Sequence, residues 1–149
     1  MGKPLFRFRD VPFRDELFES YIEPAARWLL GHPDNPYLLP QYSGSNWECA
    51  LAISFLINIF EAPSTVNVEL KNEIRHKCVN TSRWMLGQAK AEGSNRSSWD
   101  GGSWDTAVCA RVLLRVLQVF EIDLSDGDRA SIRSRLAEST QWLVEKSIH

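Results

Sequence analysis

Hydrophobic positions recur along the chain with the spacing of amphipathic α-helices, and stretches rich in Gly, Pro, Ser and Asn separate them. The pattern predicts helices over approximately residues 14–31, 46–61, 66–87, 103–121 and 127–146. Pro24 is expected either to kink the first helix or to open a new one at its first position. No stretch alternates with the period of two that strands show, so the chain is expected to be all-α.

The sequence also repeats itself at an interval close to 57 residues. Arg27 to Gly31 recurs as Arg83 to Gly87, Asn46 to Ala50 recurs as Ser103 to Ala107, and Trp142 lies 58 residues after Trp84. Repeats of this kind are single structural units that bury a core only by stacking on their neighbours. We therefore expect one domain over 1–149, with a first helical-hairpin repeat at 14–65, a second at 66–124, and a final helix at 125–149 that begins a third.

The second helix of each hairpin is apolar in most directions but carries a matching set of polar residues. Residues 46–61 contain Ser54, Asn58 and Glu61, and adding 57 to each position gives Arg111, Arg115 and Gln118 in the equivalent helix. Spacings of four and three place each trio on one helical face. The equal offset predicts that the two polar faces point the same way and line one concavity.

The residues around the second repeat resemble a known family. The segment 98–107 reads Ser-Trp-Asp-Gly-Gly-Ser-Trp-Asp-Thr-Ala, Gln88 follows Trp84, and 27–60 is a more diverged copy. This pattern resembles the prenyltransferase and squalene-cyclase repeat of the α/α-toroid families. The resemblance implies stacked helical hairpins of an (α/α) toroid-like array, and two complete repeats predict that one chain does not close a ring.

The residues that carry the chemistry of that family have no match in this sequence. The acidic cluster at 123–128 departs from the Asp-x-Asp-Asp acid of the cyclases. Asp105 and Cys109 lack the Asp-x-Cys spacing of the zinc-binding prenyltransferases. We therefore expect no catalytic residue, no metal and no cofactor.

Composition narrows the class of partner and the compartment. The chain has 149 residues, 44% of them hydrophobic, and a formal net charge of −2, which disfavours nucleic acid as a partner. The longest apolar run, 50–60, is too short to span a membrane. Cys49, Cys78 and Cys109 are odd in number and far apart, which is typical of reduced thiols in the cytoplasm.

The candidate ligand-binding residues follow from the polar strip and the loops. They are Arg111, Arg115, Gln118, Ser54, Asn58 and the loop residue Trp99. Arg111 and Arg115 lie within one turn and could together hold a phosphate or carboxylate, the alternative being that both are solvated surface residues. Trp99 and Tyr42 lie in the loops before the second helices of the hairpins and are candidates for contacting a ligand or a protein. The repeated Trp residues are interpreted as packing anchors, or alternatively as the lining of a hydrocarbon pocket; they are Trp28, Trp47, Trp84 and Trp104.

These observations favour a non-catalytic binding module with a sensory or regulatory role, which recognises an anionic small molecule or a partner protein on its concave face. One alternative is a fragment or subunit of an isoprenoid-processing enzyme, in which the arginines would grip a diphosphate. A second is a structural adaptor that binds proteins through its outer helices. Two repeats leave a terminal apolar face exposed, which predicts a homo-oligomer or attachment to a larger assembly.

Overall fold

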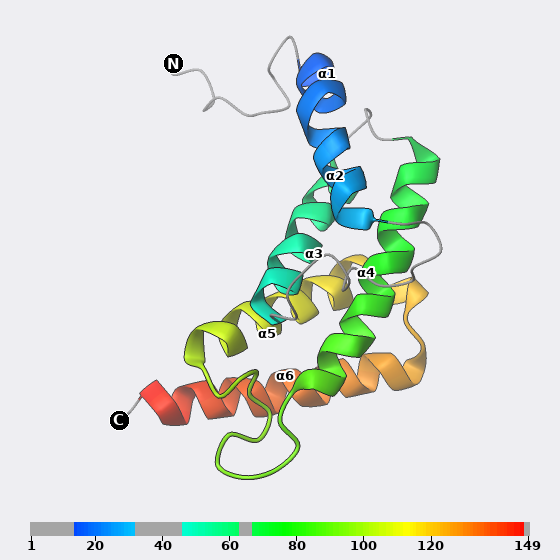
Figure 1. Ribbon diagram of the computed structural model, residues 1–149. Coiled ribbons are helices and arrows are strands. Elements are labelled where there is room, and N and C mark those ends of the chain that lie inside the picture. The colour runs from blue at the N-terminus through cyan, green and yellow to red at the C-terminus, as the bar shows by residue number, and fades with distance from the viewer. Residues whose placement is uncertain (1–13, 32–45, 63–66, 148–149) are drawn as a thin grey trace, which may run out of the picture.

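The computed structural model describes residues 14–31, 46–62 and 67–147 (Figure 1). Within these ranges the chain is helical and has no strand, so the all-α prediction is confirmed there. The elements are α1 (Arg14–Leu17), the π-helix η2 (Phe18–Ile22), α2 (Glu23–Leu30), α3 (Asn46–Glu61), α4 (Val68–Gln88), α5 (Ser103–Val119), the 3-10 turn η4 (Glu121–Asp123) and α6 (Asp126–Ser147).

The first helix is continuous but changes its hydrogen-bond pattern before Pro24. In η2 the backbone N–H of Glu23 donates to the carbonyl of Phe18, five residues back, and Pro24 then stands at the start of α2. A proline has no N–H and its ring crowds the carbonyl one turn earlier, so a wider turn at this point accommodates it. Gly31, with a φ of 67°, ends the helix as the sequence predicts.

Side-chain caps set the starts of α4 and α6. Asn67 precedes α4, and its Oδ1 accepts the backbone N–H of Leu70 at 2.7 Å. Ser125 precedes α6, and its Oγ accepts the backbone N–H of Asp128 at 3.0 Å. Such caps satisfy donors that have no partner within the helix, so the predicted boundaries lie within one or two residues of the observed ones. The α5 helix ends earlier than expected because Phe120 leaves helical geometry and η4 follows.

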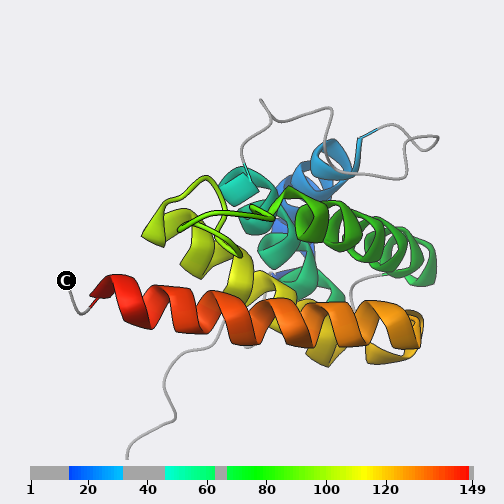
Figure 2. The same ribbon diagram turned by 90° about the horizontal axis from the view of Figure 1, so that it is seen from below.

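The helices α3 and α5 lie side by side and run in the same direction. At their starts Asn46 Nδ2 donates to Asp100 Oδ2 at 3.2 Å, and toward their ends Arg115 Nη1 donates to Asn58 Oδ1 at 3.0 Å. The helix α4 packs against α3, α6 lies along α5, and α4 also contacts α2, α5 and α6 (Figures 1 and 2). These contacts join α2, α3, α4, α5 and α6 in one packed unit.

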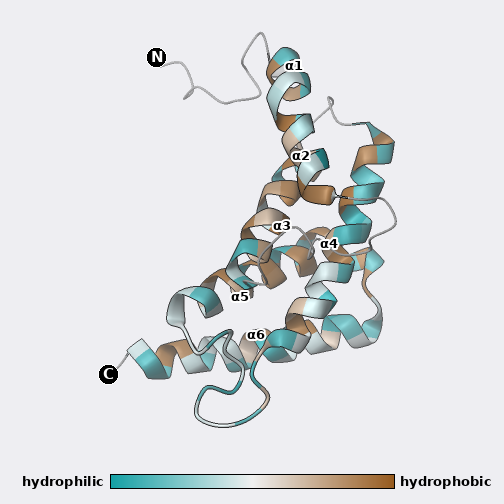
Figure 3. Ribbon diagram, viewed as in Figure 1, coloured by the Kyte–Doolittle hydropathy of each residue, from teal (hydrophilic) through white to brown (hydrophobic). Residues whose placement is uncertain are grey.

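The core lies where α3, α4 and α5 face one another. The α3 helix is hydrophobic along most of its length, whereas α4 alternates between hydrophobic and hydrophilic residues (Figure 3). Fully buried side chains come from each of these helices and from α6; they include Ile53, Leu56, Ile57, Ile74, Leu113, Val116 and Ile132. Phe60 meets Phe120 edge to face, with ring centroids 4.9 Å apart, and extends this core to the ends of α3 and α5.

The loop between α4 and α5 is fastened to both the core and α6. Ser139 Oγ donates to the carbonyl of Ser97 at 2.7 Å, and Trp142 Nε1 donates to the carbonyl of Ser94 at 3.2 Å. Two of its residues that are not glycine, Ser97 and Asp100, adopt positive φ values of 67° and 56°. Because these backbone conformations cost free energy, the surrounding hydrogen bonds must hold them.

Candidate functional site

Arg115 joins the polar strips of α3 and α5. Its Nη1 donates to Asn58 Oδ1 at 3.0 Å and to Ser54 Oγ at 3.4 Å, and its Nη2 donates to Glu61 Oε1 at 2.8 Å. Asn58 and Arg115 are the pair that the 57-residue offset relates. The structure thus brings Ser54, Asn58 and Arg115 together on one face, as the repeat predicts.

The same contacts limit what Arg115 can offer to a ligand. The Glu61 carboxylate neutralises the guanidinium, and the Arg115 side chain is three-quarters buried between the helices. An incoming anion would have to displace Glu61, since a guanidinium already paired with a carboxylate has little remaining attraction for a second one. Arg115 therefore acts mainly as a joint between α3 and α5.

Arg111 and Gln118 lie on the exposed side of α5, one turn before and nearly one turn after this joint. Both side chains are exposed. Within the described ranges neither makes a hydrogen bond, and Arg111 has no ion pair. Of the two predicted arginines, only Arg111 is free to bind a carboxylate or phosphate without breaking an existing contact.

Trp99 does not belong to this strip, and the prediction that its side chain contacts a ligand is not supported by its position. It is fully buried, at 0% exposure. Its indole Nε1 donates to the carbonyl of Met85 at 2.8 Å, and its backbone N–H donates to Thr106 Oγ1 at 3.1 Å. The loop turns the indole inward, so Trp99 is part of the core. Tyr42, the other loop aromatic, lies outside the described residues.

The repeated Trp residues are also placed differently from the prediction. Trp84 is half-buried and packs against the core, as a packing anchor should. Trp28 and Trp104, however, are each 65% exposed and Trp47 is 36% exposed, so burial in the described core does not support a role as packing anchors for these three. The buried stripe of α5 passes through Thr106, Cys109 and Leu113, and Trp104 falls on the opposite side of that helix.

An apolar hollow lies next to Trp104, between the start of α5 and the end of α6. Its apolar walls are Trp104, Ala107, Leu143 and Val144, and its volume is about 590 Å³. The polar residues of its lining are Ser103, Lys146 and Ser147. The next exposed residue along α5, one turn beyond Ala107, is Arg111. We call this hollow together with Arg111 the α5 face. It combines exposed hydrophobic side chains with an unpaired cation.

The cysteines carry no sign of reactive chemistry. Cys49, Cys78 and Cys109 are buried and unpaired by disulfides. Burial raises the pKa of the Cys49 thiol to about 11, with a smaller contribution from Glu48. Burial also raises the pKa of Cys78 and of Cys109. All three remain protonated thiols at neutral pH and behave as small hydrophobic residues.

Comparisons with known proteins assign no family to this chain. The chain matches no family model, and neither a curated protein nor a solved structure matches it. In the part of the chain that the structure describes, no helix is both long and apolar enough to span a bilayer. Over the same ranges, no three His, Cys, Asp or Glu side chains gather in a way that could hold a metal ion.

Proposed function

We propose that the chain is a non-catalytic binding module and that the α5 face is its docking surface for a partner protein. The observation that carries this proposal is the unpaired cation of Arg111, one helical turn from a hollow walled by Trp104, Ala107, Leu143 and Val144. The partner that fits is an amphipathic helical segment with apolar side chains for the hollow and a carboxylate for Arg111.

The openness of this face favours a protein over a small molecule. Trp104 is 65% exposed, and Val144 is 53% exposed at the opposite wall. Small-molecule sites usually enclose most of the ligand surface, which side chains this exposed cannot do. Trp and Arg are also enriched at the centres of protein interfaces, where burial of a large apolar side chain supplies much of the affinity.

Adjacent hydrophobic residues widen the surface available to such a partner. Leu114 is exposed one turn beyond Arg111 on α5, and Trp47 and Leu51 are exposed near the start of the parallel helix α3. Exposed apolar residues that gather on one side of a domain mark interaction sites more often than isolated ones do. This supports a role for the face that α3 and α5 share.

The toroid-like repeat is part of the same proposal. Its support is the parallel arrangement of α3 and α5 and the contact between Asn58 and Arg115, which occupy equivalent positions in the two repeats. The isoprenoid-enzyme alternative needs Arg111 and Arg115 to grip one diphosphate together. The pairing of Arg115 with Glu61 gives that alternative no support.

A charge-reversal experiment tests the proposed docking. Two synthetic helical peptides would share the same leucine stripe, and one would carry Glu where the other carries Lys. Isothermal titration should give tighter binding of the Glu peptide by the wild-type protein, and Arg111→Glu should reverse this preference. Trp104→Ala should weaken the binding of both peptides because the apolar anchor is lost.

A matched control lies nearer the other end of α6, away from the hollow. Arg133 is an exposed arginine on α6, and Arg133→Glu should leave the peptide preference unchanged. Equal binding of the two peptides by the wild-type protein, or a preference that survives Arg111→Glu, would show that the α5 face does not select acidic partners. A dimer that buries Trp104 in light scattering and fluorescence quenching would instead assign the face to a second copy of the chain.

A further inference from the structure

Lys146 is a second cation at the α5 face. It lines the hollow together with Ser103, the first residue of α5, and Ser147, the last residue of α6. The Lys146 side chain is exposed, and its Nζ lies 5.6 Å from the centroid of the Trp142 ring, one turn earlier in α6. In the described part of the chain Lys146 forms no ion pair, so its three N–H donors are available to a carboxylate.

Arg111 and Lys146 lie toward opposite ends of the apolar hollow. The helices α5 and α6 run in opposite directions, since the start of α5 and the end of α6 line one hollow. At the other end of the pair, Arg133 Nη2 lies 4.0 Å from Glu121 Oε1, just beyond the end of α5. Lys146 therefore stands near the level of Ser103, and Ser103 precedes Arg111 by about 12 Å of helix. The apolar walls lie between the two cations.

The lining of the hollow carries positive charge and no carboxylate. Among its described residues Lys146 is the only charged one. The neighbouring carboxylate on α6, that of Glu145, instead lines a separate hollow between α6 and the loop at 93–97, where it accepts from Gln141 at 3.1 Å. With Arg111 added, the α5 face is positive although the whole chain has a formal net charge of −2. This charge favours an acidic partner.

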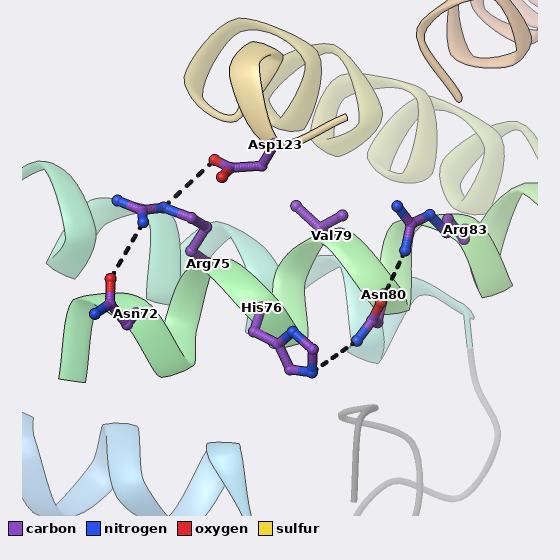
Figure 4. A pocket seen from close by; sticks show the side chains of 7 residues that line it. All are labelled: Asn72, Arg75, His76, Val79, Asn80, Arg83 and Asp123. Atoms are coloured by element: carbon purple, nitrogen blue, oxygen red, sulfur yellow. Dashed lines mark hydrogen bonds and ion pairs between the residues drawn. The ribbon is translucent and has the colours of Figure 1, made fainter. Parts of the chain in front are cut away.

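A hollow on α4 differs from the α5 face because its cations already have carboxylate partners. Figure 4 shows Arg75 and Arg83 toward its two ends. Arg75 Nε lies 3.4 Å from Asp123 Oδ2, and Arg83 Nε donates to Asp128 Oδ2 at 2.8 Å. An acidic partner at this hollow would compete with both aspartates, whereas the two cations of the α5 face accept a carboxylate without losing an ion pair.

We propose that the α5 face binds an acidic amphipathic helix with two carboxylates two turns apart, one for Arg111 and one for Lys146, and with apolar residues between them for the hollow. Lys146 is then a specificity-determining residue of the docking surface, and its role rests on the docking proposed above. Positions i and i+7 of a helix share a face and lie about 10.5 Å apart along its axis, close to the separation of the two cations.

Helical spacing also defines the residues between the two carboxylates. Positions i+3 and i+4 lie on the same face as i and i+7, so apolar side chains there meet the hollow. The expected pattern is Glu-x-x-Leu-Leu-x-x-Glu, or its equivalent with Asp and other apolar residues. Each cation takes its own carboxylate, so the two cations do not have to reach one group.

Four peptides of one helical sequence test this pattern. All carry the same pair of leucines, and Glu or Gln stands at the two acidic positions, so that the set contains both carboxylates, either one alone, or neither. A staple on the opposite face of each peptide keeps its helicity constant. Isothermal titration against the full chain should give the tightest binding for the peptide with two Glu. Each Glu→Gln change should raise the Kd by about threefold, as expected for a solvent-exposed ion pair.

Two protein variants assign each carboxylate to its cation. Arg111→Gln should abolish the advantage of one Glu position and keep that of the other, and Lys146→Gln should do the reverse. The assignment also gives the direction of the bound helix. Lys71→Gln, which changes a lysine of α4 that lies beside Phe60, is the matched control and should leave all four Kd values unchanged.

The same titrations distinguish failure of the Lys146 contact from failure of the docking. Equal Kd values for the wild type and Lys146→Gln with every peptide would overturn the role of Lys146, and a response to Arg111→Gln would leave the docking in place. If both variants removed the advantage of the same Glu, the two-turn spacing would be wrong. No binding of any of the four peptides, or binding that Trp104→Ala does not weaken, would overturn the docking and the role of Lys146 with it.

Discussion

Trp99 and Trp104 stand five residues apart on either side of a glycine turn, yet one is fully buried and the other is 65% exposed. The indole of Trp99 packs in the core and donates to Met85, while Trp104 forms a wall of the open α5 face. The comparison teaches that a loop aromatic can be a structural anchor and a helical one can be a surface feature. The direction of the side chain decides which of these two roles a tryptophan has.

The largest expected effect comes from truncating the buried member of this pair. Trp99→Ala should lower the free energy of unfolding by about 3–5 kcal/mol, because it removes a large core side chain and leaves a cavity. Trp104→Ala should change it by less than about 0.5 kcal/mol, since an exposed side chain loses few contacts. Urea denaturation followed by far-UV circular dichroism measures both. Similar losses for the two variants would break the distinction between a structural and a surface tryptophan.

The sequence predicted this fold where local rules decide it. Hydrophobic periodicity and Gly31 placed the helices, because periodicity and glycines with positive φ act within a few residues. The 57-residue offset predicted that Asn58 and Arg115 share a face, because equal spacing on two parallel helices keeps their faces aligned. These features depend on the chain's own periodicity.

The features that the sequence did not predict depend on irregular backbone. The burial of Trp99 requires a loop in which Ser97 and Asp100 take positive φ values, which non-glycine residues seldom adopt. The ion pair between Arg75 and Asp123 requires η4 to fold back onto α4. The exposure of Trp104 follows from the absence of a covering helix over that side of α5 in the described part of the chain. No local pattern signals any of these placements.

A smaller effect should come from the hydroxyl that holds the Trp99 backbone. Thr106 Oγ1 accepts the Trp99 N–H at 3.1 Å and donates to the carbonyl of Gly102 at 2.7 Å. Thr106→Val keeps the shape but leaves the buried N–H of Trp99 without an acceptor, while the Gly102 carbonyl keeps the backbone N–H of Thr106, so the free energy of unfolding should fall by about 1–3 kcal/mol. Thr140→Val on the exposed side of α6 is the matched control and should be nearly neutral. A neutral Thr106→Val would indicate that the loop holds Trp99 without this hydroxyl.

The two arginines of α5 should differ in their effect on stability in the same way as the two tryptophans. Arg115→Gln removes the joint to Asn58 and Glu61 and should cost about 1 kcal/mol, because the contacts are only partly shielded from solvent. Arg111→Gln removes no contact and should leave the unfolding free energy unchanged. A double-mutant cycle between Arg115 and Glu61 isolates their coupling. Additive effects of Arg115→Gln and Glu61→Gln would mean that the joint contributes no stability.

The smallest effect should come from pH, through the attachment of the Trp99 loop to α6. The hydrogen bond from Ser97 lowers the pKa of Glu138, and Arg96 and Arg135 lower it further, while partial burial opposes them. A carboxyl with a lower pKa in the folded state stabilises the fold at neutral pH, and this contribution disappears as the pH falls through that lower value. Glu138→Gln should therefore reduce Tm slightly at neutral pH and make Tm less sensitive to acid.

The control for this pH dependence is Glu145, an exposed carboxyl on α6 whose described partner is only Gln141. Glu145→Gln should leave the acid dependence of Tm as it is in the wild type. Because the Ser97 contacts fasten the loop that buries Trp99, the loss of Glu138 should also increase amide hydrogen exchange at residues 94–99 more than on the α5 face. Equal exchange in both regions would show that the hydrogen bond to Glu138 does not keep the loop closed over the core.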